Sequence, residues 1–155
     1  MKAIRQSAGI LLYRWHDGVA EVFLVHPGGP FWAKKDAGAW SIPKGEFTGE
    51  EPLAAAKREF MEETGTLPGM KNVMPLVPVQ LKSGKMVYAF AGEGDIEADK
   101  ITSNLCRVEW PPKTGKMIEV PEVDRAGWFG IDEARFKINI SQAAFINELA
   151  ALLNL

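Results

Sequence analysis

Three glutamates near the middle of the chain, Glu59, Glu62 and Glu63, are spaced at i, i+3 and i+4 and follow directly on Arg58. On a helix, this spacing places the three carboxylates on one face. Two carboxylates about 4 Å apart repel each other by about 4 kcal/mol at an effective dielectric constant of roughly 20. An ion pair on a helix stabilises it by only about 0.3 to 0.5 kcal/mol. One arginine therefore does not balance three glutamates.

This excess of negative charge can be relieved in three ways. The glutamates turn outward into solvent, one of them takes up a proton, or a hard divalent cation binds among them. Ligands that are all oxygen, with no histidine or cysteine nearby in the sequence, favour Mg²⁺ or Mn²⁺ over zinc. The spacing alone leaves both a solvated acidic face and a metal site open.

The residues around the glutamates are suited to an α-helix of about four turns. Pro52 fits the first helical position, the alanines at 54–56 favour continuation, and Gly65 can adopt the left-handed conformation that ends a helix. The carboxylates then lie near the C-terminal end, where the helix dipole disfavours negative charge. That position is unfavourable for a purely structural acidic patch.

Residues upstream complete a longer pattern. The run 41–45, followed by Glu50 and the stretch 58–65, resembles the Nudix box, G-x5-E-x7-R-E-U-x-E-E-x-G-U, in which U is a bulky apolar residue. Seven residues separate Glu50 from the arginine, as the pattern requires. Two positions differ, because four residues rather than five separate Gly45 from Glu50, and Thr66 replaces the final apolar residue. No charged position is lost.

The resemblance covers almost the whole chain. Residues 7–13 and 21–26 look like the opening hairpin of the family, and residues 124–129 look like its late strand. The neighbourhoods of 40–45 and 25–27 are most similar to the branch that includes dinucleoside polyphosphate hydrolases and predicted nucleoside triphosphate pyrophosphohydrolases.

The resemblance implies a role for each charged residue of the box. Glu59, Glu62 and Glu63 would bind Mg²⁺ or Mn²⁺, and Arg58 would orient a glutamate, with Glu50 as the first choice. The cation would neutralise a diphosphate and help to generate hydroxide from water. The expected reaction splits a nucleoside diphosphate linked to another group X, and the expected substrate is a dinucleoside polyphosphate or a nucleoside triphosphate.

A fourth carboxylate is expected from the second half of the chain. Glu122 lies just before the late strand, where enzymes of this family often carry an additional metal ligand or general base. A surface-loop position without a catalytic role is the alternative. The segment 111–121, with Lys113 and Lys116, is long for a simple connection and could form a substrate loop.

Residues before the box and at its start are candidates for substrate binding. Lys44 and Gly45 open the box, where the lysine could contact phosphate, and Lys34 and Lys35 could meet a polyphosphate chain. Trp32 could stack on a nucleobase. The alternative is a solvated side chain for each lysine and a packing role for the tryptophan.

The hydrophobic patterns indicate one domain, residues 1–155, long enough for a sizeable core. The expected strands are 3–13, 19–25, 40–43, 73–81, 86–90, 105–110 and 126–129, and a second long helix is expected at 141–153 with Ser141 as its N-cap. Strands mixed with two long helices suggest an α/β class fold, an α/β/α sandwich with a mixed β-sheet. The resemblance implies the same fold.

Charge and composition limit the partners. The formal net charge of −2 gives no general basic surface for duplex nucleic acid or an anionic membrane. The single cysteine, Cys106, cannot form an internal disulfide, and no long apolar segment precedes the first strand, so the cytoplasm is the expected location. A small nucleotide is the expected partner, and the oligomeric state is left open. A nucleotide-binding module without catalysis is the alternative function, against which the intact set of charged box residues argues.

Overall fold

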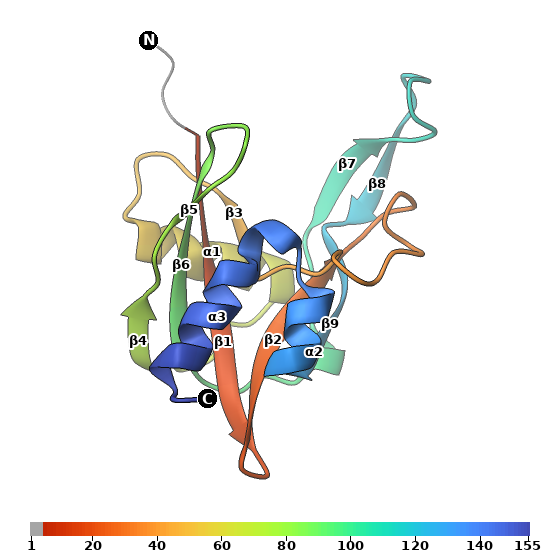
Figure 1. Cartoon of the computed structure of the whole chain (residues 1–155). Coiled ribbons are helices and arrows are strands. Elements are labelled where there is room, and N and C mark those ends of the chain that lie inside the picture. Colours follow the sequence, from red (N-terminus) through yellow and green to blue (C-terminus); the bar gives the residue numbers. More distant parts are fainter. Residues whose placement is uncertain (1–4) are drawn as a thin grey trace.

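A mixed β-sheet forms the centre of the protein in a computed structural model that describes residues 5–155 (Figure 1). Its strands are β1 (Gln6–His16), β2 (Val19–Pro27), β3 (Lys44–Glu46), β4 (Lys71–Pro75), β5 (Val79–Gln80), β6 (Met86–Glu93) and β9 (Val123–Gly130). The main path runs β4-β6-β1-β2-β9, with β3 paired to β1 and β5 paired to β6. Strand β1 is central, because it pairs antiparallel with β2 and β3 and parallel with β6.

Helices cover both faces of this sheet (Figure 1). Helix α1 (Pro52–Thr64) packs on one face, whereas α2 (Ile131–Lys137) and α3 (Ala143–Leu152) cover the other. Side chains of β1 alternate between the two cores, with Ile10 on the α1 face beside Phe60, and Leu11 on the α3 face beside Phe145 and Leu149. The expected α/β/α sandwich is confirmed. None of the helices formed by residues 5–155 combines the length and apolar character needed to cross a membrane.

Helix α1 begins and ends where local signals in the sequence predict. Pro52 occupies the first turn, where its missing N–H costs nothing. Gly65 ends the helix with a left-handed φ of 82°, and its N–H donates to the carbonyl of Met61 at 2.7 Å. The helix therefore has a defined C-terminal end directly after the acidic residues.

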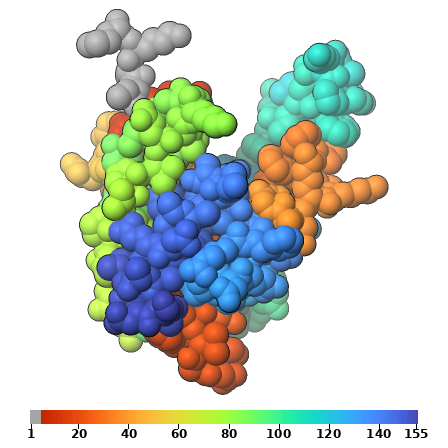
Figure 2. All heavy atoms as spheres, in the orientation of Figure 1, coloured from red at the N-terminus to blue at the C-terminus, as the bar shows by residue number. Residues whose placement is uncertain are grey.

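A two-stranded antiparallel arm stands apart from the main sheet. It consists of β7 (Leu105–Glu109) and β8 (Met117–Pro121) and projects from the body beside the loop 28–39 (Figures 1 and 2). At the base of the arm, the N–H of Glu122 donates to the carbonyl of Asn104 at 2.9 Å. The arm thus delivers Glu122 to a fixed position at the start of β9.

Several predicted boundaries are wrong by a few residues. The predicted strand 40–43 forms only isolated bridges, and the regular strand β3 lies directly after it. The predicted strand 73–81 divides into β4 and β5 around Pro78, which has no N–H for the ladder. For the first predicted strand, residues 3 and 4 lie outside the described residues, and β1 continues to His16.

The C-terminal helix begins later than predicted. Ser141 lies in the short 3₁₀ helix η2 (Ile140–Gln142), and the side chain of Asn139 accepts a hydrogen bond from the Ser141 N–H at 2.9 Å. Asn139 therefore caps η2, whereas the N-cap position of α3 is Gln142, which makes no side-chain capping hydrogen bond.

Candidate functional site

Three carboxylates meet between α1 and the base of the arm. Glu59, Glu63 and Glu122 each place one oxygen within 4.8 Å of the others. The two helix residues are only 6% and 5% exposed, whereas Glu122 is half-buried. The i, i+4 spacing turns Glu59 and Glu63 to the same side of α1. Glu122 joins them from a distant part of the sequence, and its carbonyl accepts the N–H of Gly28 at 3.0 Å.

Glu62 lies outside this group of three. Its side chain is 41% exposed and accepts a hydrogen bond from Nη1 of Arg58 at 3.1 Å. Successive helical residues are turned by about 100°, so Glu62 and Glu63 point to either side of Glu59, and Glu62 takes the more exposed side. The structure therefore gathers two of the three predicted helix ligands with Glu122 and leaves Glu62 at the solvent side.

Arg58 holds the acidic residues from the outer side of α1. Its Nε and Nη2 donate to Glu50, with the shortest contact at 2.8 Å, and its Nη1 donates to Glu59 at 2.9 Å. The predicted contact between Arg58 and Glu50 is present, and the same guanidinium also orients Glu59. Burial raises the pKa of Glu59, and the hydrogen bond from Arg58 offsets part of that rise.

The carboxyl of Glu63 carries the strongest electrostatic perturbation in the group. Burial, followed by the charges of Glu122 and Glu59, raises the pKa of Glu63 to about 9. The backbone N–H of Lys44, which donates to Glu63 Oε2 at 3.0 Å, acts in the opposite direction. Without a cation, the crowded group therefore keeps a proton on Glu63 at neutral pH.

Strand β3 brings Gly45 and Lys44 to opposite sides of the sheet edge. A Cβ at Gly45 would collide with the carboxylate of Glu59, so a glycine is needed for α1 to approach the strand. Burial and then the charge of Lys85 lower the pKa of Lys44, and its ammonium forms no ion pair within the described part of the chain. Lys44 is thus a cation without a fixed partner beside the carboxylates.

These residues fit a hard divalent cation. The three donors are all carboxylates, two of them are buried, and Glu63 must hold a proton when no positive charge compensates the group. Mg²⁺ and Mn²⁺ prefer such oxygen ligands. Glu59, Glu63 and Glu122 are the residues that would hold the ion.

The other predicted substrate residues lie on the loop 28–39. Trp32 is half-buried and packs against the α3-side core, and its ring contacts Phe31 edge-on at 5.0 Å. The Lys35 ammonium lies 3.8 Å from the ring centroid of Phe31 and 5.4 Å from that of Trp32, whereas Lys34 is exposed. Trp32 therefore packs on the core and stays partly exposed beside Lys35, and its stacking on a nucleobase stays a prediction.

The side chain of His26 anchors this loop. The ring is fully buried, with Nδ1 2.8 Å from Oδ1 of Asp124 and Nε2 2.6 Å from the carbonyl of Lys35. A carbonyl only accepts, so Nε2 carries a proton. Together with the Gly28 to Glu122 hydrogen bond, these contacts join the loop to the start of β9.

The second half of the predicted substrate loop 111–121 is a strand. Residues 117–121 form β8, and Lys113 and Lys116 are exposed in the turn at the tip of the arm. The tip is the end of the arm that lies away from strand β9 (Figure 1). The two lysines are therefore not gathered with the carboxylates.

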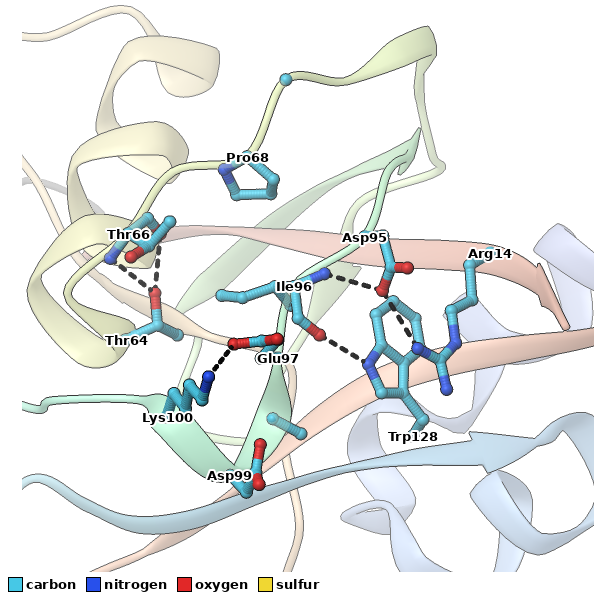
Figure 3. Close-up of a pocket in the computed structure, with 12 residues that line it drawn as sticks. Arg14, Thr64, Thr66, Pro68, Asp95, Ile96, Glu97, Asp99, Lys100 and Trp128 are labelled. Atoms are coloured by element: carbon cyan, nitrogen blue, oxygen red, sulfur yellow. Dashed lines mark hydrogen bonds and ion pairs between the residues drawn. The ribbon is translucent and has the colours of Figure 1, made fainter.

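A hollow of about 800 Å³ beside the C-terminal end of α1 is a separate feature (Figure 3). Its polar groups already pair with one another, since Arg14 contacts Asp95 at 3.0 Å and the Trp128 Nε1 donates to the carbonyl of Ile96 at 3.0 Å. None of the three clustered glutamates lines it. The carboxylate group instead lies beside β3, where Lys44 donates its N–H to Glu63, and there we place the candidate site.

The pKa of Glu63 leads to a prediction about stability in metal-free buffer. The unfolded chain releases this proton near pH 4.5, whereas the folded protein keeps it up to about 9. Unfolding therefore releases a proton between these values, and stability falls as the pH rises through them. Glu63→Gln removes this loss while its amide oxygen still accepts the Lys44 N–H. We expect the variant to have a Tm about 5 °C or more above the wild type near pH 8.

Thermal unfolding followed by circular dichroism in EDTA would measure this difference. The difference in Tm between Glu63→Gln and the wild type should disappear toward about pH 4.5, where the folded and the unfolded wild-type chain both hold the proton. Glu62→Gln, at an exposed position of the same helix, is the matched control and should show no pH-dependent gain. A Tm difference for Glu63→Gln that stays constant between about pH 5 and pH 8 would contradict the buried, protonated carboxyl.

Comparisons with known proteins agree with the fold and with the motif. The family described as NUDIX domain matches residues 3–149. The sequence has no significant match among curated proteins.

Solved structures with the same fold include two nucleotide-related proteins. The NUDIX domain of NrtR from Shewanella oneidensis, complexed with ADP ribose, is 16% identical with a TM-score of 0.68, covering 99% of this chain and 90% of that one. An Ap4A hydrolase of C. elegans, in a binary complex, is 20% identical with a TM-score of 0.67, covering 97% and 98%. The RenU Nudix hydrolase of M. smegmatis is 17% identical with a TM-score of 0.60, covering 99% and 89%. At these identities, the likeness shows the fold.

Proposed function

Because the chain belongs to the NUDIX domain family, whose reaction is hydrolysis of phosphoanhydride bonds, we propose that it is a Mg²⁺- or Mn²⁺-dependent pyrophosphohydrolase of nucleoside diphosphate derivatives. The proposal rests on one observation above all. Glu59, Glu63 and Glu122 each place a carboxylate oxygen within 4.8 Å of the other two. Keeping three carboxylates together in a largely buried position is unfavourable without a bound cation. A module that only binds a nucleotide has no need of such a cluster.

Each residue around the cluster has a chemical task in this proposal. When bound, a divalent cation neutralises phosphate charge and lowers the pKa of water. Arg58 fixes the direction of Glu59 and favours its ionised form. Glu122 is the member of the group that solvent reaches, so it is placed to accept a proton from the attacking water. Lys44 supplies a positive charge for a substrate phosphate, and positioning with charge stabilisation is most of what phosphoryl transfer requires.

The proposed substrate carries a chain longer than a diphosphate. Lys34 and Lys35 lie on the loop that the Gly28 to Glu122 hydrogen bond ties to the acidic site, and Lys44 lies on β3 beside Glu63, in a protein whose net charge is −2. Local cations of this kind attract polyphosphate where the overall charge does not. This favours a dinucleoside polyphosphate or a nucleoside triphosphate over ADP-ribose or a sugar nucleotide. The likeness to an Ap4A hydrolase structure is consistent with this choice.

A chromatographic product assay tests both class and substrate. Diadenosine tetraphosphate, 8-oxo-dGTP and ADP-ribose are compared at equal concentration with Mg²⁺ and with Mn²⁺. We expect the highest kcat/KM for one of the two longer chains, and asymmetric cleavage of diadenosine tetraphosphate to ATP and AMP, because the lysines hold the chain to one side of the carboxylates. A kcat/KM for ADP-ribose more than about tenfold higher, roughly 1.4 kcal/mol of transition-state stabilisation, would refute the long-chain substrate but not the hydrolase. Nucleotide binding without any product would instead indicate the non-catalytic module.

A further inference from the structure

The last carbonyls of helix α1 are bound by a short segment that precedes the arm. A helix leaves its last four carbonyls without partners inside the helix. The N–H of Thr102 donates to the carbonyl of Thr64 at 2.9 Å. The N–H of Asn104 donates to the carbonyl of Glu62, also at 2.9 Å. We call residues 102–104 the α1 clip, because they fasten the chain directly before β7 to the helix that carries two of the clustered glutamates.

The α1 clip also holds the residue that joins these glutamates from the arm. The carbonyl of Asn104 accepts the N–H of Glu122 at 2.9 Å. The Oγ of Ser103 accepts the N–H of Val123 at 2.9 Å, and the same hydroxyl donates to the Asn104 carbonyl at 2.9 Å. The peptide groups before and after Glu122 are therefore both bound to the clip.

Ser103 supplies an acceptor that the sheet does not provide. Strand β9 ends the main sheet formed by residues 5–155, so its outer side has no neighbouring strand. Val123 is only 4% exposed, and a buried N–H is costly when it has no acceptor. The half-buried hydroxyl of Ser103 is that acceptor. Without it, the peptide group that follows Glu122 would lose its fixed contact to the clip.

The direction of the Glu122 side chain depends on this backbone. Its two partners in the carboxylate group have donors for their own side chains. Glu59 accepts a hydrogen bond from Arg58. Glu63 accepts one from the N–H of Lys44. The contacts of Glu122 are made by its backbone, so the place of its carboxylate follows from where the α1 clip and the Gly28 N–H hold that backbone.

We propose that Ser103 is a positioning residue for Glu122. Through the α1 clip, its hydroxyl refers the backbone of Glu122 to the end of α1, and so keeps the third carboxylate beside the two on the helix. The proposal rests on the proposed pyrophosphohydrolase function, because Glu122 is the proton acceptor in that reaction. Ser103 itself acts only through the backbone, and its side chain has no task in binding the cation or the substrate.

Calorimetric titration with Mn²⁺ alone, without nucleotide, tests the α1 clip apart from turnover. Ser103→Ala is expected to weaken Mn²⁺ binding about tenfold, within the roughly 10- to 100-fold range for residues that orient metal ligands. Ser103→Thr keeps a hydroxyl at this position and should bind Mn²⁺ as the wild type does. The Tm of Ser103→Ala should also fall, so each titration is made at a temperature where circular dichroism shows the variant to be folded.

Thr114→Ala is the matched control for the loss of a hydroxyl. The Thr114 hydroxyl makes the same two kinds of contact, since it donates to the carbonyl of Pro111 and accepts the N–H of Lys116. It lies in the turn at the tip of the arm, so its removal should change neither Mn²⁺ binding nor turnover. A purely structural role for Ser103 would lower the Tm and leave Mn²⁺ affinity unchanged, and that result would overturn the proposal.

Steady-state kinetics separates the α1 clip from the proposed function itself. With a hydrolysed nucleotide at saturating Mg²⁺, Ser103→Ala should lower kcat about tenfold with KM nearly unchanged, and Ser103→Thr should restore kcat. If Ser103→Thr is as slow as Ser103→Ala, the hydroxyl is not the cause and the positioning role is wrong. Mn²⁺ affinity that is equal in Ser103→Ala and the wild type, in a protein that does hydrolyse nucleotides, would overturn the positioning role and leave the pyrophosphohydrolase standing. A tenfold loss of Mn²⁺ affinity in Ser103→Ala, in a protein that hydrolyses none of the nucleotides, would support the clip and refute the pyrophosphohydrolase.

Discussion

Glu63→Gln is expected to lower kcat by more than about 10²-fold at saturating Mg²⁺, because changes that only disturb the orientation of metal ligands already cost about 10- to 100-fold. Glu63 is buried in the group of three carboxylates, and the amide that replaces it carries no charge for a cation. The fold should remain intact, since the amide oxygen keeps the hydrogen bond from Lys44. Initial rates over a range of Mg²⁺ concentrations would measure both the loss of turnover and the weaker metal dependence.

Glu62→Gln provides the matched comparison on the same helix. Its side chain is 41% exposed and contacts Arg58 rather than the other two carboxylates. We therefore expect less than about a tenfold loss, within the range for a residue that acts through a neighbour. If Glu62→Gln loses as much activity as Glu63→Gln, or if neither variant changes turnover, the assignment of the metal to Glu59, Glu63 and Glu122 is wrong.

Helix α1 was predictable because its signals are local. Pro52 and Gly65 set its ends through their own backbone preferences, and these do not depend on the rest of the fold. It was harder to predict which of the helix carboxylates lie close together. The 100° turn per residue separates Glu62 from Glu63, yet only the position of the neighbouring strand β3 shows that the buried side is the one with Glu59 and Glu63.

Glu122 and His26 illustrate contacts that local sequence patterns do not specify. His26 meets Asp124 across 98 positions, and Glu122 is placed by hydrogen bonds with Asn104 and Gly28. The resemblance to the Nudix family indicated Glu122, but not the arm that carries it. The segment 111–121 was predicted as a substrate loop because it is long for a simple connection, whereas pairing with β7 makes residues 117–121 a strand.

The arrangement of Ser7, Lys44 and Lys85 around β1 was not predictable from sequence, for a related reason. Ser7 lies on β1, Lys44 on β3 and Lys85 directly before β6, so their relative positions depend on two registers, β1 with β3 and β1 with β6. A shift of either register by one residue would move the side chains to the opposite face. The predicted strand at 40–43 lies just before β3 and therefore could not have revealed the pairing of Lys44 with Gly9.

Glu122→Gln is expected to slow the chemical step by roughly 10²- to 10⁴-fold, the usual range for removing general-base assistance. Glu122 is the member of the carboxylate group that solvent reaches, and its backbone is held on both sides by hydrogen bonds. The amide can fill the same space but cannot accept a proton from water. Rapid-quench measurement of a single turnover would isolate this step from product release.

Two comparisons decide what Glu122 does. Glu119→Gln, at an exposed position on β8 three residues earlier, controls for the loss of one negative charge on the arm and should keep full activity. If Glu122 acts mainly as a metal ligand, a higher Mg²⁺ concentration should restore part of the rate of Glu122→Gln, because weak binding is overcome by mass action. If it acts as the base, saturating Mg²⁺ restores nothing. A loss of less than about threefold, far below the range for a general base, would assign the proton to Glu59 or to the cation-activated water alone.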